Sequence, residues 1–206
     1  MCVFYSILLA LGAFCLGACP FSVWIGKRLA YKEIRNYGDG NPGASNVFRA
    51  SGTKLGVLAL ILEIGKGAPF VVLAYTFFGL PDAAALAIGL CAILGHAYSP
   101  LLGMKGGKAL AVTLGVLLAL PQHDILVGML ALTLLGYLTM ESDSWAVMIA
   151  PPGTLIYLLF TRGISWEALF MLFVFAIFVA KQYSDLQAVP RIKLKPFAWL
   201  KSGRTA

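Results

Sequence analysis

The chain has 206 residues, of which 60% are hydrophobic and only 12% are charged. A soluble globular domain carries about 25% charged residues, so this composition excludes an ordinary soluble protein and predicts an all-α polytopic membrane protein. Lysine and arginine outnumber the acidic residues by 16 to 9. In a membrane protein this excess indicates topology and contact with anionic lipids first. No basic helix or aromatic–basic platform occurs in the sequence, which argues against nucleic-acid binding.

Seven apolar stretches are expected to cross the membrane as helices, because a span needs roughly 20 apolar residues. The expected spans are residues 3–25, 55–78, 83–94, 109–120, 125–140, 145–160 and 166–180. No basic segment precedes the first of them, so we expect a retained helix and not a signal peptide. The fourth is short for a full crossing, and Pro151-Pro152 should kink the sixth. A basic cytoplasmic tail from about residue 181 completes a single integral membrane domain over residues 1–206.

The longest polar, turn-forming stretch runs from Gly38 to Arg49. Its first nine residues hold three glycines, one proline and two asparagines, which disfavour a continuous helix and favour a loop. The backbone N–H groups of such a loop can converge on an anion. Asn41 and Asn46 add side-chain donors, and Arg49 adds a guanidinium fork suited to phosphate. The alternative is a plain connector between two membrane helices.

A second polar stretch follows the third span and ends in Lys105-Gly106-Gly107-Lys108. Two cations around a backbone that permits close approach suit an anionic ligand. The stretch is not a Walker A loop, because it lacks the following serine or threonine and the preceding strand. His96, at the end of the third span, is a candidate base, with a hydrogen-bonded interface residue as the alternative.

The second span contains two charged residues, Glu63 and Lys66, three positions apart. This spacing places them on one helix face, where each partly neutralises the other. Charges inside a span are costly and indicate either a functional site or a structural ion pair, and the sequence leaves both open. The four cysteines lie in apolar runs without metal-ligand spacing, so we expect neither a metal site nor a cofactor.

The charged residues sort between two sides when the loops between seven spans are laid out alternately. Apart from Arg162, every lysine and arginine outside the spans falls in the first, third or fifth loop or in the C-terminal tail. The positive-inside rule therefore predicts a cytoplasmic C-terminus and an N-terminus outside. Both glycine-rich loops would then face the cytoplasm, where phosphorylated metabolites are found.

Three motifs resemble the bacterial acyl-phosphate:glycerol-3-phosphate acyltransferases of the PlsY type. They are the stretch from Gly38 to Arg49, then Glu63-Ile-Gly-Lys-Gly67, then Gly95-His-Ala-Tyr-Ser-Pro100 with Lys105-Gly-Gly-Lys108. Their order and spacing and the seven-span layout match over nearly the whole chain. The resemblance implies an enzyme of the bacterial inner membrane. It would move a fatty acyl group from acyl phosphate to the 1-hydroxyl of glycerol 3-phosphate, giving lysophosphatidic acid for phospholipid synthesis.

The resemblance also implies that residues of both loops bind the phosphates of donor and acceptor: Asn41, Gly43, Asn46, Arg49 and Lys108. We take Lys108 and His96 as candidate catalytic residues. Further candidate substrate-binding residues are Asp39, Lys105, Gly106, Gly107 and Ser142. No covalent enzyme intermediate is needed, because acyl phosphate is already an activated donor. Cations and backbone N–H groups can stabilise its phosphate as it departs.

Several family positions are replaced in this chain. The family usually has serine at Asp39, aspartate at Glu63, and Gly-Val-Ala-Thr at residues 109–112. The histidine and asparagine that normally end the seventh helix correspond to Gln182 and Asp185. Asp39 could cap its loop, pair with a loop cation, or bind a hydroxyl of another acceptor. Two other functions stay open: a non-catalytic relative that binds a phosphorylated lipid or metabolite, and a small transporter of an anionic metabolite.

Overall fold

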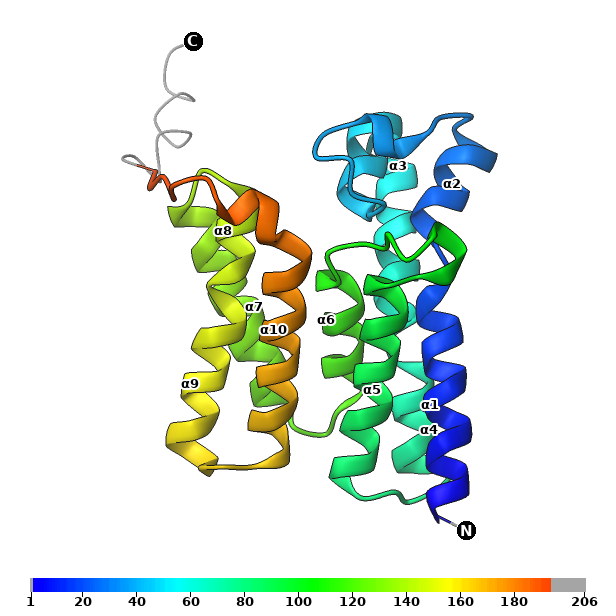
Figure 1. Ribbon diagram of the computed structural model, residues 1–206, viewed down its shortest axis with the longest axis vertical. Helices are drawn as coiled ribbons and strands as arrows, with labels where there is room; N and C mark the ends of the chain where they lie inside the picture. Colours follow the sequence, from blue (N-terminus) through cyan, green and yellow to red (C-terminus); the bar gives the residue numbers. More distant parts are fainter. Residues whose placement is uncertain (1, 194–206) are drawn as a thin grey trace.

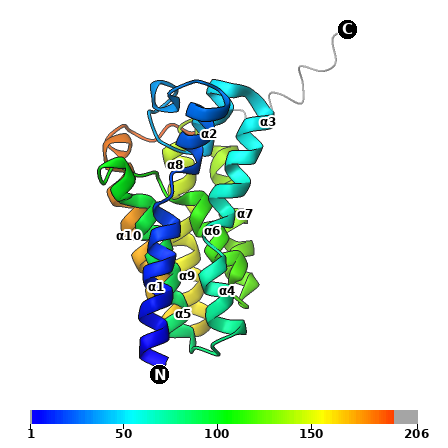
Figure 2. The ribbon, with the colours of Figure 1, turned by 90° about the vertical axis from the view of Figure 1, so that its right-hand side faces the viewer.

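The computed structural model describes residues 2–193, and these form an all-helical bundle. The long helices run roughly along one axis, and the connecting segments gather at the two ends (Figure 1). Both glycine-rich stretches and the last described residues lie at one end, hereafter the loop end. The N-terminus lies at the opposite end, and Figure 2 shows the same arrangement from the side.

Within residues 2–193, five helical segments are long and apolar enough to cross a membrane, and two shorter apolar helices bring the number to the expected seven. The five are Cys2–Leu29, Ala44–Thr76, Asp82–Leu102, Asp143–Arg162 and Trp166–Leu186, and the two are Leu110–Ala119 and His123–Thr139. Large apolar side chains such as Leu8, Leu134 and Phe160 are exposed on the outside of the bundle. An apolar outer surface fits contact with lipid, and the chain is a multi-pass membrane protein.

The first expected span, residues 3–25, is not one helix. The structure divides it into α1 (Cys2–Ala18) and α2 (Phe21–Leu29). The break falls at Pro20, which has no backbone N–H and which disfavours a helical conformation for the residue before it. α2 therefore leaves the axis of α1 and begins the loop end (Figure 1).

The expectation of a loop as far as Arg49 was wrong, because α3 (Ala44–Gly65) already begins at Ala44. Helix-compatible residues follow Gly43, so the loop ends there and Arg49 lies on the second turn of the helix. Gly52, with φ 79° and ψ −176°, breaks α3 into a short first piece and a longer second piece that enters the bundle. The second expected span is also broken, and α4 (Pro69–Thr76) begins at a proline, which suits the first turn of a helix.

The middle of the chain holds α5 (Asp82–Ala97), a 3-10 turn η2 (Pro100–Leu102) and α6 (Leu110–Ala119). α6 has only 10 residues, which confirms that the fourth expected span is short. The segment between η2 and α6 carries the second glycine-rich stretch back over the loop end. A turn at residues 120–122 then leads to α7 (His123–Thr139).

The sixth expected span is divided into α8 (Asp143–Met148) and α9 (Ala150–Arg162). The two helices meet at Ile149, whose φ of −70° and ψ of −34° are helical. Pro151 and Pro152, which cannot donate helical N–H bonds, interrupt the hydrogen bonding there, and the expected kink stays a prediction. α10 (Trp166–Leu186) runs past Lys181, so the basic tail begins later than expected. No glycine or proline interrupts residues 181–186, and the helix simply continues.

The start of the tail pairs with the turn between α7 and α8 instead of lying free. Ile192 forms an antiparallel bridge with Met140, and the backbone N–H of Lys193 donates to the carbonyl of Thr139 at 2.7 Å. The rest of the predicted basic tail, residues 194–206, lies outside the described residues.

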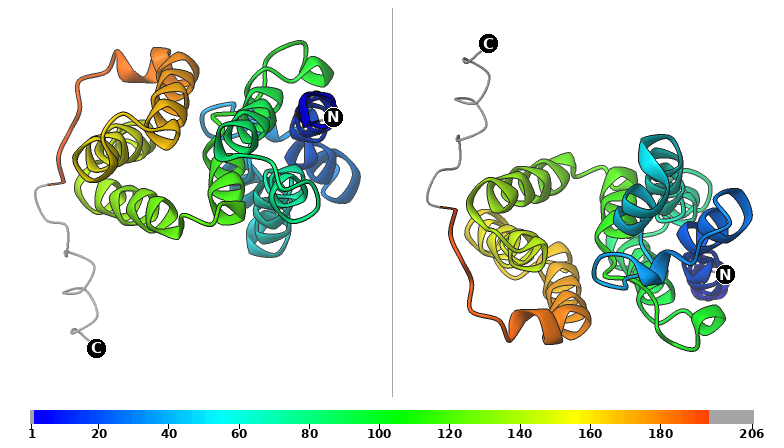
Figure 3. Two further views of the ribbon diagram at one scale, coloured as in Figure 1. Left: turned by 90° about the horizontal axis from the view of Figure 1, so that it is seen from below. Right: turned by 90° about the horizontal axis from the view of Figure 1, so that it is seen from above.

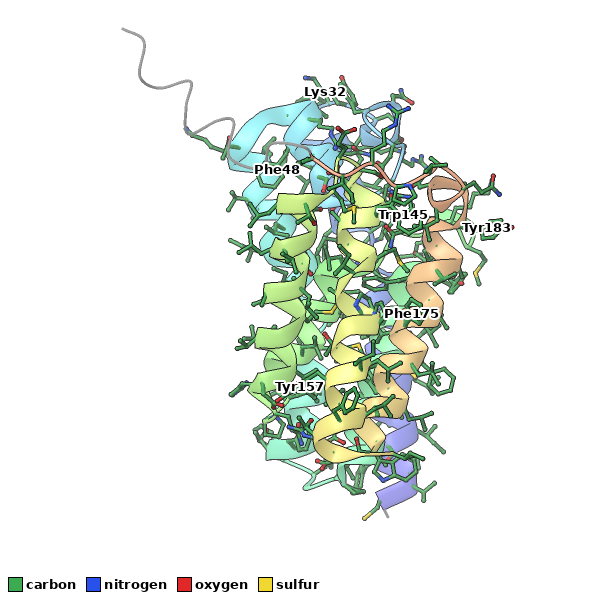
Figure 4. The ribbon with its side chains drawn as sticks, turned by 90° about the vertical axis from the view of Figure 1, so that its left-hand side faces the viewer. Lys32, Phe48, Trp145, Tyr157, Phe175 and Tyr183 are labelled. Atoms are coloured by element: carbon green, nitrogen blue, oxygen red, sulfur yellow. The ribbon has the colours of Figure 1, made fainter. Side chains whose placement is uncertain are left out.

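Two groups of helices stand side by side, α1 to α6 in one and α7 to α10 in the other (Figure 3). One main apolar core runs through both groups. A smaller core under the first glycine-rich loop holds α2, the 3-10 turn η1 (Ile34–Asn36) and α3 together through residues such as Val23, Ile34 and Val47. Figure 4 shows the second group with its side chains, with Trp145 towards the loop end and Tyr157 towards the opposite end.

Candidate active site

A cavity opens between the two groups of helices at the loop end. The first group contributes both glycine-rich stretches and parts of α3, α5 and α6, and the second contributes α7, α8 and α10. Its polar lining residues include Asp39, Asn41, Arg49, Glu63, His96, Lys108, Asp143, Ser144 and Gln182, and its apolar lining includes Leu60, Leu110, Leu114 and Val147. One side of the cavity can hold an anion and the other an apolar chain.

The first glycine-rich loop is shaped by Gly38 and Gly40, which both have positive φ angles, 57° and 71°. L-residues with side chains rarely adopt this conformation, so glycine is favoured at both positions. At Gly38 a Cβ atom would also collide with the side chains of Asn46 and Arg49. The missing side chain thus lets the loop lie directly against the first turns of α3.

Asp39 closes this loop from within. Its Oδ1 accepts the backbone N–H of Asn41 at 3.1 Å and the side-chain amide of Asn46 at 2.9 Å. The Asn46 amide also donates to the backbone carbonyl of Asn41 at 2.9 Å. Asp39 therefore caps the loop, which is one of the three roles that the sequence left open, and Asn46 joins the loop to α3.

Lys108 is the meeting point of the two groups of helices. Its Nζ lies 2.7 Å from Asp39 Oδ2 and 2.6 Å from Asp185 Oδ2, and it donates to Ser144 Oγ at 3.1 Å. Ser144 Oγ in turn donates to Asp185 at 2.8 Å. Asp39 thus has the second of its three expected roles as well, because it pairs with a loop cation while it caps its own loop.

Arg49 forms the second bridge between the groups. Its Nη2 lies 2.9 Å from Asp143 Oδ2, on the first turn of α8, and its Nη1 donates to Asn46 Oδ1 at 2.9 Å. Asp143 is 61% exposed and Arg49 is 43% exposed, so a ligand anion can displace the carboxylate at little cost.

Both charges of the pair between Asp39 and Lys108 are stabilised by their surroundings. Burial opposes ionisation of Asp39, but hydrogen bonds from Lys108 and from the Asn41 amide outweigh it, and the pKa of the carboxyl is below its usual range. Burial also disfavours the Lys108 ammonium, but Asp185 and Asp39 outweigh it and raise the pKa of that lysine. The ion pair therefore persists over the physiological pH range.

His96 lies in the last turn of α5 and has a charged partner. It is buried, and its Nδ1 lies 3.2 Å from Glu63 Oε2. Lys66 lies 2.6 Å from the same oxygen, which confirms the ion pair expected from the spacing in α3. Neither contact has the angle of a directed hydrogen bond at Oε2, whereas Oε1 accepts both the N–H and the hydroxyl of Ser22, at 3.1 and 2.7 Å.

The remaining predicted residues lie at different depths. Asn41 and Gly43 line the cavity. Gly106 and Gly107 are buried behind it against His96, and Lys105 is exposed outside it. Ser142 precedes α8 and faces a separate groove beside Arg191. The residue that reaches the cavity is Ser144, two positions later.

The sequence reasoning missed three polar lining residues of the second group, Asp143, Ser144 and Tyr137. A signal for the first two was available: Ser142 and Asp143 form a typical helix start. The helix brings Ser144 around to the cavity. Asp185 was noted only as a replaced position, and its contact with Lys108 spans 77 residues of sequence.

Carboxylates outnumber cations around the cavity. Two cations, Arg49 and Lys108, contact three carboxylates, those of Asp39, Asp143 and Asp185. The cations can bind and stabilise phosphate oxygens. A phosphate must therefore compete with these carboxylates for the two cations.

Comparisons with known proteins agree with this geometry. The family model described as glycerol-3-phosphate acyltransferase matches residues 7–190. The glycerol-3-phosphate acyltransferase of Syntrophotalea carbinolica is 35% identical over 187 residues, which cover 91% of this chain and 94% of the relative. That of Lactococcus lactis subsp. cremoris strain SK11 is 33% identical over 208 residues, which cover 96% of this chain and 97% of the relative.

Two crystal structures of PlsY, an integral membrane glycerol 3-phosphate acyltransferase, are similar over 98% of this chain and 94% of the PlsY chain. The glycerol 3-phosphate form superposes with a TM-score of 0.80 at 28% identity. The lysophosphatidic acid form superposes with a TM-score of 0.78 at 26% identity. The match of the family model over most of the sequence, together with this common fold, shows that the chain belongs to the glycerol-3-phosphate acyltransferase family of membrane enzymes.

Proposed function

We propose that this membrane acyltransferase moves a fatty acyl group from acyl phosphate to the 1-hydroxyl of glycerol 3-phosphate. The observation that carries the proposal is the position of Arg49 and Lys108. Arg49 comes from α3 and Lys108 from the second glycine-rich stretch, and both line one cavity. Phosphate is the group common to both substrates, and the cavity offers it two cations and the amide of Asn41.

The phosphates enter by exchanging partners. A phosphate oxygen takes the place of Asp143 on the fork of Arg49, and a second phosphate oxygen takes one of the carboxylate positions around Lys108. Ser144 remains beside Lys108 and can donate to the same oxygen. Because Arg49 and Asp143 are both partly exposed, we place the first exchange at the mouth of the cavity.

The acyl chain lies along the apolar wall of the cavity. Leu60 of α3 and Leu110 and Leu114 of α6 form this wall, next to the phosphate-binding residues. Leu60 is 37% exposed, and we infer that the wall continues towards lipid. The acyl phosphate can therefore keep its chain among helices and lipid while its phosphate reaches Lys108.

The chemical step needs no enzyme nucleophile. The 1-hydroxyl oxygen of the acceptor forms a bond to the carbonyl carbon of the donor, and the bond from that carbon to the phosphate oxygen breaks. The phosphate leaves with the electron pair and takes up the hydroxyl proton. Lys108 and Arg49 stabilise the negative charge that grows on the departing phosphate, and the two held substrates react by proximity.

We place the protein in the bacterial inner membrane, with both glycine-rich loops and the C-terminus in the cytoplasm and the N-terminus outside. The charge distribution of the loops supports this orientation, and the substrates are cytoplasmic metabolites. A reporter fused after Ala206 should be active only in its cytoplasmic form, and a cysteine placed at Asp82 should react with a reagent added from outside. A periplasmic C-terminus would contradict the orientation.

One observation favours a second candidate, a relative that binds a phosphorylated ligand without turnover. Both phosphate-binding cations are occupied by carboxylates, and two of these, Asp39 and Asp185, stand where the family usually has serine and asparagine. If they are not displaced, a donor phosphate cannot reach Lys108, and only weak binding at Arg49 remains.

Phosphate release tests the proposal against this candidate. Purified protein is incubated with acyl phosphate, with and without glycerol 3-phosphate, and inorganic phosphate is measured over time. We expect release that depends on the acceptor and that is lost in Lys108→Ala. Glu167→Gln removes a carboxylate that pairs with Arg162 at the opposite end of the bundle, and it should keep full activity. Equal release with and without the acceptor would reject acyl transfer.

A further inference from the structure

We propose that Glu63 is a positioning residue for Lys108 and acts through His96. The inference rests on the proposed role of Lys108 as the phosphate-binding cation, and it assigns a task to the buried charged cluster that the chemical step does not use. The cluster comprises Ser22, Glu63, Lys66 and His96. All four side chains are buried, and Glu63 and Lys66 are each only 1% exposed.

The cluster joins three helix ends in the first group of helices. Ser22 lies just after the break between α1 and α2, and Lys66 lies just after the end of α3. Lys66 Nζ also donates to the backbone carbonyl of Cys19 at 2.8 Å, directly before that first break. His96 lies in the last turn of α5. A single carboxylate, that of Glu63, thus holds the start of α2, the end of α3 and the end of α5 together.

The next link runs from His96 to the second glycine-rich stretch. The backbone N–H of Gly107 donates to the carbonyl of His96 at 3.2 Å. A Cβ atom at Gly106 would collide with that same carbonyl, and one at Gly107 would collide with Nε2 of the imidazole ring. The backbone of Gly106 and Gly107 therefore packs directly against His96. Glu63 contacts the other side of the imidazole ring, at Nδ1.

Lys108 follows this contact directly. The next residue, Ala109, has a φ of 68°, a left-handed conformation that costs about 1 kcal/mol or more in a residue with a side chain. Such a conformation persists only where the surroundings hold it. The contact with His96 on one side and the start of α6 on the other supply that restraint.

These contacts together fix the position of the Lys108 ammonium. Its Nζ contacts Asp39 and Asp185 from a backbone that rests on His96 through Gly107. Glu63→Gln removes the negative charge that attracts Lys66 and favours a proton on Nδ1 of His96, and its amide can turn either its oxygen or its NH2 group towards the ring. The imidazole is then no longer held in one orientation, and the stretch that rests on it is less well fixed. A displacement of about 1 Å in such a loop can lower a rate by roughly 100-fold.

Chemical labelling of lysines tests the inference without relying on activity. Purified protein is treated briefly with an amine-reactive reagent, and the labelling of each lysine is measured by peptide mass spectrometry. In Glu63→Gln, Lys108 should react several-fold faster than in the wild type, because it is released from its carboxylates. Lys193 donates from its Nζ to the carbonyl of Tyr137 in the second group of helices, outside the cluster. Its labelling should not change, which distinguishes a local effect from general loosening.

A second variant tests the contact between His96 and Gly107 and leaves the ion pair of Glu63 and Lys66 in place. His96→Gln removes the ring on which Gly107 rests and leaves Glu63 with Lys66, so it decides the question if Glu63→Gln does not fold. It should also raise the labelling of Lys108. If His96 were the catalytic base instead, His96→Gln would abolish turnover while the labelling of Lys108 stayed at the wild-type level.

Activity provides the second readout. In both variants kcat/KM with glycerol 3-phosphate should fall roughly 10- to 100-fold, and the control Glu167→Gln should be unaffected. Unchanged labelling of Lys108 in a folded Glu63→Gln or His96→Gln protein would overturn the inference. If the wild type shows no acyl transfer, the proposed function fails, but the labelling comparison still decides whether Glu63 positions Lys108.

Discussion

Neutralising Asp185 should improve the binding of acyl phosphate, whose phosphate we place at Lys108. Asp185 and Asp39 hold Lys108 from two sides, with oxygen–nitrogen distances of 2.6 and 2.7 Å. An incoming phosphate must approach the same ammonium. Asp185→Asn keeps an oxygen that can accept hydrogen bonds from Lys108 and Ser144, and it removes only the charge. We prefer it to Asp39→Ser, because Asp39 also caps its own loop.

The magnitude follows from Coulomb's law. A phosphate oxygen in contact with Lys108 lies roughly 5 Å from the Asp185 carboxylate, where two unit charges repel by about 1 kcal/mol in water and about 3 kcal/mol at an effective dielectric constant of 20. The Asp185 side chain is 37% exposed, so solvent screening places the effect near the lower end, about 1–2 kcal/mol. This corresponds to roughly a 5- to 30-fold decrease in KM for acyl phosphate.

Steady-state kinetics at two ionic strengths provide the assay. The decrease in KM of Asp185→Asn should be largest at low salt and should shrink at high salt, because screening weakens the repulsion in the wild type. Glu167→Gln, which alters a carboxylate at the opposite end, should leave KM unchanged at both. An unchanged or higher KM in Asp185→Asn at low salt would refute the view that this carboxylate competes with the substrate.

Three further changes test other parts of the site. Arg49→Ala should weaken the binding of glycerol 3-phosphate by roughly 10-fold or more, measured by calorimetry, because a charged hydrogen bond contributes about 1.5–3 kcal/mol. Arg49→Lys should restore little of it, since a point charge does not replace a bidentate fork, and full restoration would contradict fork binding. Ala109→Gly should raise the melting temperature by roughly 2–3 °C by removing left-handed strain, and a lower value would show that the Ala109 methyl packs usefully. Finally, the pKa of Asp39 is lowered from 3.8 and that of Lys108 is raised from 10.5. The stabilisation from Asp39 is therefore present above pH 3.8 and lost as the pH falls further, and that from Lys108 is present below pH 10.5 and lost as the pH rises further. Melting curves of wild type and Lys108→Ala should converge at both extremes and differ most in between.

The helical membrane fold could be predicted because apolar length and charge distribution are properties of contiguous sequence. The break at Pro20 and the early start of α3 were missed for different reasons. Pro20 lies within a continuous apolar run, so hydropathy alone does not show that the chain changes direction there. The density of turn-forming residues up to Gly43 conceals that no further glycine or proline occurs before Gly52, so a helix can begin at Ala44. Both errors concern boundaries, and neither changes which end of the bundle carries the loops.

The candidate site could be predicted only as far as its local motifs reach. Arg49 and Lys108 were identified because glycine-rich stretches with cations have a local signature. Their partners Asp143, Ser144 and Asp185 belong to the other group of helices, and no local pattern indicates which carboxylate will meet which cation. The same holds for Glu63 and His96, each recognised separately as unusual. Their contact at 3.2 Å depends on how α3 packs against α5.

The most direct test of the central claim is identification of the product by mass spectrometry. Purified protein is given acyl phosphate and isotopically labelled glycerol 3-phosphate, and the lipid extract is examined for labelled lysophosphatidic acid acylated at the 1-position. We predict this product in the wild type and in Glu167→Gln, and its loss in Lys108→Ala. Folded wild-type protein that binds glycerol 3-phosphate and yields no labelled acyl product would contradict the claim and leave a binding protein in its place.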